Sequence, residues 1–305
     1  MKISFGADFG IGRVSGLQMQ TKTNAYTNPI LQSDSVSFSG NKETKKVNVD
    51  YETAKFVANS LSTSTSGHRA VYGSKTFNPE VVELMTTGVG QYAKDMAEKE
   101  GKKPVVIIGG DTREATQKSL PLINDTLTKQ GVDVLYIKDP VPTPLLAMMT
   151  KENDIDIAIL LTASHNPWAD GGYNLVTKEG AIAPPDVTGK IAENIVETAK
   201  KGYYTVNTAD KGKTEEVYPY EMYKNNLEDS NLINWDKIRN SNISIYYDGL
   251  KGTGEYVFPR LLDDCGISFK SVKSGEKEGP NPTKENLFEF REEIKNDGSQ
   301  MKIGL

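Results

Sequence analysis

The stretch IAILLTASHNPWADGGYN, residues 157–174, contains the part of the chain that decides its fold. Its first five residues, Ile157–Leu161, form an apolar run that is too short for a helix and is typical of a buried central strand in a parallel sheet. The residues from 163 to 172 cannot continue that strand, so they leave its carboxyl end as a loop. Ligands of open α/β sheets bind outside the carboxyl ends of the strands. We therefore expect Ser164 and His165 to be presented on a functional loop.

Short apolar runs and helical segments alternate on both sides of this stretch. Asn78, Pro79 and Glu80 are typical of a helix start, with a capping side chain, a proline in the first turn and an acidic residue near the positive end of the dipole. The expected helices cover 79–100, 115–130, 143–152 and a segment opened by Pro184 and Pro185, and the expected strands cover 105–108, 132–137 and 155–161. This alternation favours a mostly parallel sheet layered by helices.

A second set of elements follows, with strands expected at 243–247 and 267–272, helices at 255–264 and from 282, and a strand from 301. The predicted fold class is α/β, with two three-layer α/β/α domains that have mixed, mostly parallel sheets. We place the first domain at residues 51–205 and the second at 206–305. Residues 1–50 are polar and show no sustained periodicity, so we expect a disordered or poorly ordered leader.

The composition is that of an ordinary globular protein. The net charge of −5 gives no electrostatic reason to expect nucleic acid as a partner, and an anionic substrate would need a locally positive pocket. No apolar run approaches the roughly 18 residues of a membrane span, and the N-terminus lacks a secretion signal. We therefore expect a cytoplasmic protein without a membrane partner. Its single cysteine, Cys265, excludes an intrachain disulfide.

Four short motifs in sequence order resemble those of the α-D-phosphohexomutases, the phosphoglucomutase and phosphomannomutase superfamily. The motifs are Thr65-Ser-Gly-His-Arg69, Gly109-Gly-Asp-Thr-Arg113, Pro142-Thr-Pro144 and Thr162-Ala-Ser-His-Asn-Pro167 followed by Asp170-Gly-Gly172. The last of these is similar to the family's phosphoserine loop. The resemblance covers the chain from about residue 62 to its C-terminus.

The resemblance implies a role for each candidate residue. Ser164 would carry a phosphoryl group, give it to a hexose phosphate and recover another, and hexose 1,6-bisphosphate would act as activator. We predict Ser164, His165 and Arg69 as catalytic residues, Arg69 because a guanidinium stays charged and binds phosphate through two N–H groups. The predicted substrate- or phosphate-binding residues are Thr65, Ser66, His68 and Lys178. The predicted structural residues are Asp111, Arg113 and Asn166.

The family's metal site is implied only in part. The family binds Mg²⁺ through a loop of alternating aspartates and through the phosphate on the serine, and two further domains hold the sugar and its phosphate. None of the aspartates can be assigned here, so Ser164 is the one expected metal contact. We expect a truncated phosphoglucomutase-type enzyme that lacks the metal loop and those domains, which a separate chain would supply.

One position departs from the family pattern. A lysine, a general acid/base candidate, normally follows the glycine pair and one apolar residue, but this chain has Asn174 there. Asparagine cannot take over proton transfer, and Lys178 is the nearby replacement that we consider. A non-catalytic binding or interaction protein that retains the fold is therefore the alternative function, and phosphomannomutase specificity is the alternative within the family.

A serine hydrolase is a third hypothesis. The chain has no Gly-x-Ser-x-Gly motif, and a serine directly followed by a histidine is poorly placed for the hydrogen bond of a catalytic triad. His68 would have to act as the base. The sequence therefore disfavours this class.

Overall fold

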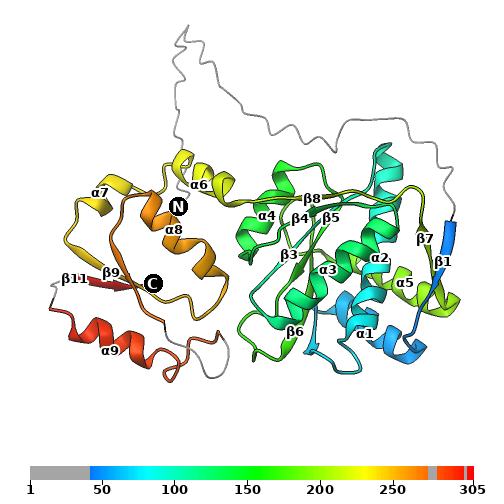
Figure 1. The fold of residues 1–305 in the computed structure, drawn as a ribbon, viewed down its shortest axis with the longest axis horizontal. Helices are drawn as coiled ribbons and strands as arrows, with labels where there is room; N and C mark the ends of the chain where they lie inside the picture. The colour runs from blue at the N-terminus through cyan, green and yellow to red at the C-terminus, as the bar shows by residue number, and fades with distance from the viewer. Residues whose placement is uncertain (1–41, 274–279, 299–300) are drawn as a thin grey trace, which may run out of the picture. The chain divides into compact units, whose positions relative to one another are not determined.

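The computed structural model describes residues 42–273, 280–298 and 301–305 (Figure 1). In these ranges the helices are α1 (Tyr51–Thr63), α2 (Pro79–Glu100), α3 (Glu114–Lys129), α4 (Thr143–Glu152), α5 (Pro185–Lys201), α6 (Tyr220–Asp229), α7 (Trp235–Arg239), α8 (Phe258–Asp264) and α9 (Phe288–Asn296). The strands are β1 (Lys42–Lys46), β2 (His68–Val71), β3 (Val105–Gly110), β4 (Asp133–Tyr136), β5 (Ile157–Leu161), β6 (Asp170–Val176), β7 (Tyr203–Asn207), β8 (Thr214–Glu216), β9 (Ile243–Tyr247), β10 (Phe269–Ser271) and β11 (Met301–Gly304).

A six-stranded mixed sheet with the order β2-β6-β5-β3-β4-β8 positions the serine loop. Strands β5, β3, β4 and β8 are parallel, and β6 runs antiparallel to both of its neighbours, β5 and β2. Since β6 returns directly alongside β5, the loop between them begins at the carboxyl end of the parallel strands. The mixed α/β fold predicted from the sequence is confirmed for this sheet.

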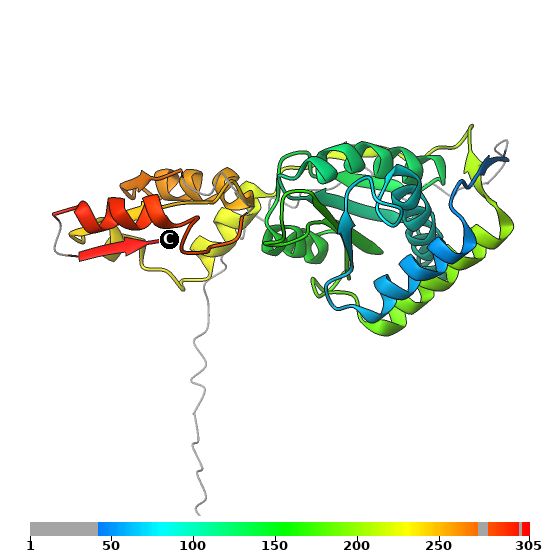
Figure 2. The same ribbon diagram turned by 90° about the horizontal axis from the view of Figure 1, so that it is seen from below.

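Helices cover both faces of the six-stranded sheet. Val106 and Ile108 of β3 belong to the main core with α1, α2, α3 and α5, and α1 lies side by side with α5 (Figure 2). Ile107 points to the other face because side chains alternate along a strand, and α4 contacts β3 and β5. Gly109 lies on that same face, where an added Cβ would come within 3.3 Å of Leu146 on α4. This makes three layers, with β3 and β5 buried on both faces.

The helix start at Asn78 is confirmed. Its side chain accepts a hydrogen bond from the N–H of Val81 at 3.0 Å, and Pro79 is the first residue of α2. The helix ends at Gly101, which has a φ of +68° and so adopts the left-handed conformation that glycine tolerates best. Local capping chemistry therefore sets both ends of α2.

Two boundaries differ from the sequence prediction. The predicted leader ran to residue 50, but Lys42–Lys46 forms β1, which pairs antiparallel with β7; the rest of the leader up to residue 41 lies outside the described residues. The first domain was predicted to end at residue 205, but β8 adds to the six-stranded sheet beside β4. Both strands are short and polar, so their hydrogen bonding to a partner distant in sequence defines them, and a periodicity argument misses them.

The later part of the chain contains a three-stranded parallel sheet with the order β10-β9-β11. Tyr247 at the end of β9 stacks on Phe258 of α8, with ring centroids 5.0 Å apart. Phe290 of α9 lies under Gly304 of β11, where an added Cβ would come within 2.9 Å of its ring. The expected parallel pairing of these strands is confirmed.

No helix within the described ranges combines the length and the apolar character needed to cross a membrane.

Candidate active site

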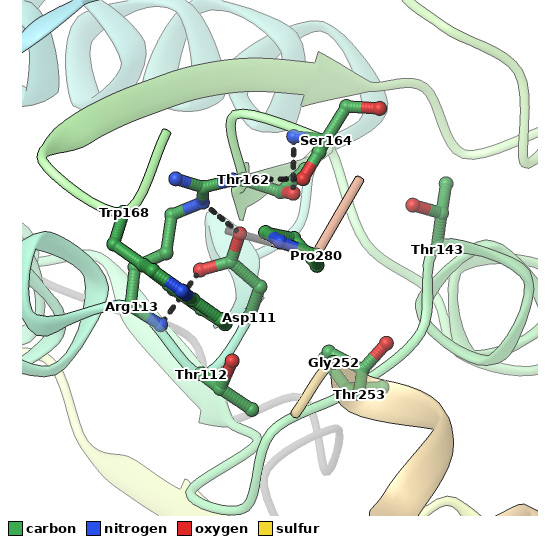
Figure 3. Close-up of a pocket in the computed structure, with 11 residues that line it drawn as sticks. Asp111, Thr112, Arg113, Thr143, Thr162, Ser164, Trp168, Gly252, Thr253 and Pro280 are labelled. Atoms are coloured by element: carbon green, nitrogen blue, oxygen red, sulfur yellow. Dashed lines mark hydrogen bonds and ion pairs between the residues drawn. The ribbon is translucent and has the colours of Figure 1, made fainter. Parts of the chain in front are cut away.

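Ser164 lies at the carboxyl end of β5, as the strand pattern predicts. Its side chain is exposed, and its φ of +58° is in the left-handed region, which a non-glycine residue rarely adopts. Its N–H donates to the Thr162 hydroxyl at 3.0 Å (Figure 3). Such a conformation costs on the order of 1–3 kcal/mol and persists only where surrounding contacts hold it. The loop therefore needs a rigid support.

Arg113 supplies that support. Its side chain is 1% exposed, and its guanidinium bears five N–H donors. These donors reach the Asp111 carboxylate at 3.0 Å, the backbone carbonyls of Ser164 and Asn166 at 2.8 Å each, the carbonyl of Asp170 at 3.3 Å and the carbonyl of Pro167. With five donors directed at five oxygens, Arg113 has none left for a phosphate, so it fixes the loop and does not bind the ligand.

Asp111 fixes Arg113 in turn. Its carboxylate accepts from the Arg113 N–H at 3.1 Å and from the Thr116 hydroxyl at 2.7 Å. Its own N–H donates to the carbonyl of Leu161, the last residue of β5. The Asp-Thr-Arg turn after β3 is thus tied to the base of the serine loop, because parallel neighbours end at the same edge of the sheet.

His165 lies within reach of the serine hydroxyl. Its Nδ1 is 3.1 Å from the Ser164 Oγ, and both side chains are exposed. The sequence predicted that a serine directly followed by a histidine is poorly placed for the hydrogen bond of a catalytic triad. In the structure, the Ser164 Oγ and the His165 Nδ1 are nevertheless within hydrogen-bonding distance, with Ser164 in a left-handed conformation. The pair places a base beside a hydroxyl.

Arg69 brings a cation to the same loop. It lies opposite Gly172 in the pairing of β2 with β6, and its guanidinium donates to the carbonyl of Ser66 at 3.2 Å and, at a longer 3.5 Å, to that of Ala163. The other N–H groups of Arg69 have no partner among the described residues. A charged group with free donors therefore lies next to Ser164.

The prediction that His68 binds phosphate is wrong. The ring is 1% exposed, its Nδ1 lies 3.0 Å from the Ser60 hydroxyl, and its Nε2 lies 2.8 Å from the carbonyl of Thr76. It also stacks on Phe77, and burial lowers the pKa of its imidazole. Since side chains alternate along β2, the position that sends Arg69 toward the loop sends His68 into the core.

The structure does not bring Lys178 to Ser164 either. Strand β6 leads away from the loop, so Lys178 lies beyond the other end of the strands, near the amino end of β5. There its amine donates to Glu100 at 2.9 Å, which raises the pKa of the lysine. The prediction that Lys178 binds substrate at the serine loop is therefore wrong.

Asn174 occupies the position of the family's lysine. It is 5% exposed, and its amide donates to the carbonyls of Leu160 and Thr162, at 3.3 and 2.9 Å. Its Oδ1 faces Gly67, where an added Cβ would come within 2.7 Å. Asn174 thus holds the start of the serine loop by hydrogen bonds and packs closely against Gly67 in the loop that carries Thr65 and Ser66.

The other predicted residues lie in these two loops. Thr65 and Ser66 are exposed, and the Ser66 N–H donates to the Ser64 hydroxyl at 3.1 Å. The amide of Asn166 donates to the Asp170 carboxylate at 3.0 Å, across the serine loop. The first pair is open to a ligand, whereas Asn166 closes the loop on itself.

A cavity of about 210 Å³ adjoins the serine (Figure 3). It is lined by Asp111, Thr112, Arg113, Val141, Thr143, Thr162, Ser164, Trp168, Gly252, Thr253 and Pro280. Of these residues, Thr112, Thr143, Thr162 and Trp168 were not predicted as site residues from the sequence. Their position in the segments that follow the carboxyl ends of β3, β4 and β5 was the signal that could have found them.

The described residues contain no group of three or more His, Cys, Asp or Glu side chains that could hold a metal ion. They do not by themselves form the Mg²⁺ site that the resemblance implies.

Comparison with known proteins identifies the motifs as those of one family. Residues 60–202 match the family described as phosphoglucomutase/phosphomannomutase, alpha/beta/alpha domain I. The chain belongs to the α-D-phosphohexomutase superfamily. The matched range includes the serine loop, the Arg69 loop and the Asp-Thr-Arg turn.

Two curated relatives are phosphoglucosamine mutases. The one from Psychrobacter sp. (strain PRwf-1) is 28% identical over 212 residues, which is 68% of this chain and 46% of the relative. The one from Pelagibacter ubique (strain HTCC1062) is 30% identical over 230 residues, which is 68% of this chain and 45% of the relative. The chain spans about half the length of these relatives.

Two solved structures share the fold. A putative phosphomannomutase from Thermus thermophilus aligns with a TM-score of 0.65 at 20% identity, over 80% of this chain and 54% of that one. Parafusin, a phosphoglucomutase from Paramecium, in its open form, aligns with a TM-score of 0.64 at 17% identity, over 86% of this chain and 52% of that one.

Proposed function

We propose that Ser164 accepts and donates a phosphoryl group in a phosphoglucomutase-type interconversion of hexose 1-phosphate and hexose 6-phosphate. The observation that carries this proposal is the geometry of Ser164. Its exposed hydroxyl is held in a left-handed backbone conformation by a fully engaged Arg113, with Arg69 and His165 beside it. Positioning and neutralisation of charge are the main requirements of phosphoryl transfer.

The loading step uses hexose 1,6-bisphosphate as phosphoryl donor. A bond forms between the Ser164 Oγ and phosphorus while the bond from phosphorus to the sugar oxygen breaks. With its own proton on Nε2, His165 accepts the serine proton at Nδ1 and returns it to the departing sugar oxygen, so that a hexose monophosphate leaves. Arg69 faces the charge that the new phosphoserine carries, roughly −1.5 to −2 at neutral pH.

Mass spectrometry of the intact chain after incubation with glucose 1,6-bisphosphate tests this proposal. We expect one added phosphate on Ser164, no added phosphate in the Ser164→Ala variant, and a rate 10²- to 10⁴-fold lower in His165→Gln, the range for loss of a general base. Thr63→Ala, an exposed change at the end of α1 and outside both loops, serves as a control for surface change. A wild-type chain that gains no phosphate would contradict the proposal.

The sugar is a second part of the proposal. We favour glucose phosphate, whereas the relatives are phosphoglucosamine mutases and a structural neighbour is a putative phosphomannomutase. Loading Ser164 from the bisphosphates of glucose, mannose and glucosamine in parallel ranks the three by initial rate. A glucose rate below the other two would overturn this preference.

A non-catalytic binding protein is the competing proposal, favoured by Asn174. The buried amide replaces a proton-transfer lysine and serves as a structural hydrogen-bond donor. If this proposal holds, the chain binds a hexose phosphate in calorimetry and Ser164 stays unmodified.

A further inference from the structure

Trp168 is an aromatic side chain of the cavity beside Ser164 (Figure 3). It lies in the serine loop four residues after Ser164, and the Arg113 guanidinium lies over its indole ring, 5.5 Å from the ring centroid. Arg113 is itself held by five oxygens, so the indole rests against a rigid cation. The ring therefore offers the cavity a positioned apolar surface.

The charge of the cavity lining is already neutralised. Its charged side chains, Asp111 and Arg113, pair with each other, and the donors of Arg113 are all engaged. The free guanidinium donors belong to Arg69, which is absent from the cavity lining and lies by Ala163. The phosphate of a ligand thus finds its counter-charge at the serine, and the cavity suits the uncharged part of the same ligand.

Side chains that carry hydroxyl groups also line the cavity. Thr112, Thr143, Thr162 and Thr253 all line it. Thr112 donates to the carbonyl of Lys251, and Thr162 accepts from the N–H of Ser164, so each of these two hydroxyls keeps further hydrogen-bonding capacity. One aromatic face and several hydroxyls match a sugar ring, which has an apolar C–H face and a rim of hydroxyl groups. The volume of about 210 Å³ lies below the roughly 300–1,000 Å³ of drug-sized ligand sites and suits a small ligand.

We propose that Trp168 is a sugar-contact residue, whose indole packs against the ring of a hexose phosphate while the phosphate lies at Ser164 and Arg69. This inference takes its ligand class from the proposed function and adds the side chain that recognises the ring. It predicts that binding energy depends on the aromatic face of residue 168 and that inorganic phosphate alone leaves that face untouched.

Tryptophan fluorescence tests the contact without altering it. The chain has two tryptophans, so Trp235→Phe leaves Trp168 as the sole reporter. In the full chain carrying this change, we expect a saturable change in emission with glucose 1-phosphate and none with inorganic phosphate at the same concentrations. An emission that responds equally to both, or to neither, would overturn the inference.

Two substitutions of Trp168 distinguish a contact that needs an aromatic ring from one that any large apolar side chain can make. We expect Trp168→Phe to keep the calorimetric affinity for glucose 1-phosphate within about threefold, and Trp168→Leu to weaken it about tenfold, the size of one aromatic contact. Equal affinity in both variants would contradict the inference. If Trp168→Leu does not fold, the fluorescence titration still decides.

The phosphate-loading assay keeps the two proposals distinguishable. A chain that shows the Trp168 response but never gains phosphate on Ser164 would refute the proposed catalysis and leave the sugar contact standing. A chain that gains phosphate on Ser164 without a Trp168 response would refute the sugar contact and support the proposed catalysis.

Discussion

At the scale of single residues, the candidate site depends on which arginine is free. Arg113 and Arg69 both lie at the serine loop, yet one directs five donors at the protein and the other directs two. Burial explains the difference, because a guanidinium that is 1% exposed must satisfy its donors internally. Arg113 is thus a structural clamp, and Arg69 remains for a ligand.

We expect Arg113→Met to destabilise the fold by about 3 kcal/mol, since it removes one partner of a buried pair and leaves the Asp111 carboxylate uncompensated. Urea unfolding measures the change. Lys118→Met in α3, the helix that follows Arg113, breaks an exposed pair with Glu114 and should change stability by less than about 0.5 kcal/mol. Similar losses in both variants would argue against the clamp.

His68 predicts a pH dependence of stability. Burial lowers the pKa of its imidazole in the folded state, so the unfolded chain, with a pKa of about 6.5, binds the proton first as the pH falls. Stability is therefore lost below about pH 6.5, and His68→Gln should show a smaller loss between pH 7 and pH 5 than the wild type. Unfolding midpoints at the two pH values measure this difference, and parallel losses would refute it.

At the scale of elements, the close approach of β6 to β5 shapes the loop. A Cβ added at Gly172 would lie 2.0 Å from the carbonyl oxygen of Thr162, a backbone atom that cannot give way without moving the strand end. Asn174 donates to that same carbonyl two residues further along β6. The start of the serine loop is therefore fixed by two contacts to the Thr162 carbonyl, the close packing of Gly172 and the hydrogen bond from the Asn174 amide.

Gly172→Ala should accordingly destabilise the protein by more than about 1 kcal/mol and slow the loading of Ser164. The matched control is Gly189→Ala in α5, where an added Cβ meets nothing within 4 Å, and it should stabilise the helix by roughly 0.5–1 kcal/mol. Thermal unfolding and phosphate loading report the two effects. If both variants had the same sign of effect, the packing explanation would be wrong.

At the scale of the molecule, the six-stranded sheet extends beyond the predicted end of the first domain. The N–H of Lys213 donates to the buried Asp133 carboxylate at 2.7 Å, and the N–H of Val134 donates to the carbonyl of Lys213 at 2.8 Å. These bonds join the segment before β8 to β4. The segment after residue 205 is thus part of the first sheet.

A fragment of residues 42–218 should therefore be more stable than a fragment of residues 42–205. The shorter one lacks β8, exposes the edge of β4 and leaves Asp133 without the Lys213 N–H. We expect a difference of about 3 kcal/mol, from several hydrogen bonds worth about 1 kcal/mol each. Denaturant titration of both fragments measures this difference. Equal stabilities would support the predicted domain boundary at residue 205.

The sequence by itself determined the strand–helix alternation, the start of α2 and the place of Ser164, because the apolar period, the capping residues and the end of a buried strand are local properties. It also predicted Arg69 as a catalytic residue and Asp111 as a structural one. The tertiary structure decided what each side chain faces. Strand alternation sends His68 into the core, the return direction of β6 carries Lys178 away, and partners far along the chain turn polar segments into β1 and β8. Only the folded chain brings Trp168, Arg113 and Ser164 around one cavity, because long-range pairing of β3, β5 and β6 places their ends together.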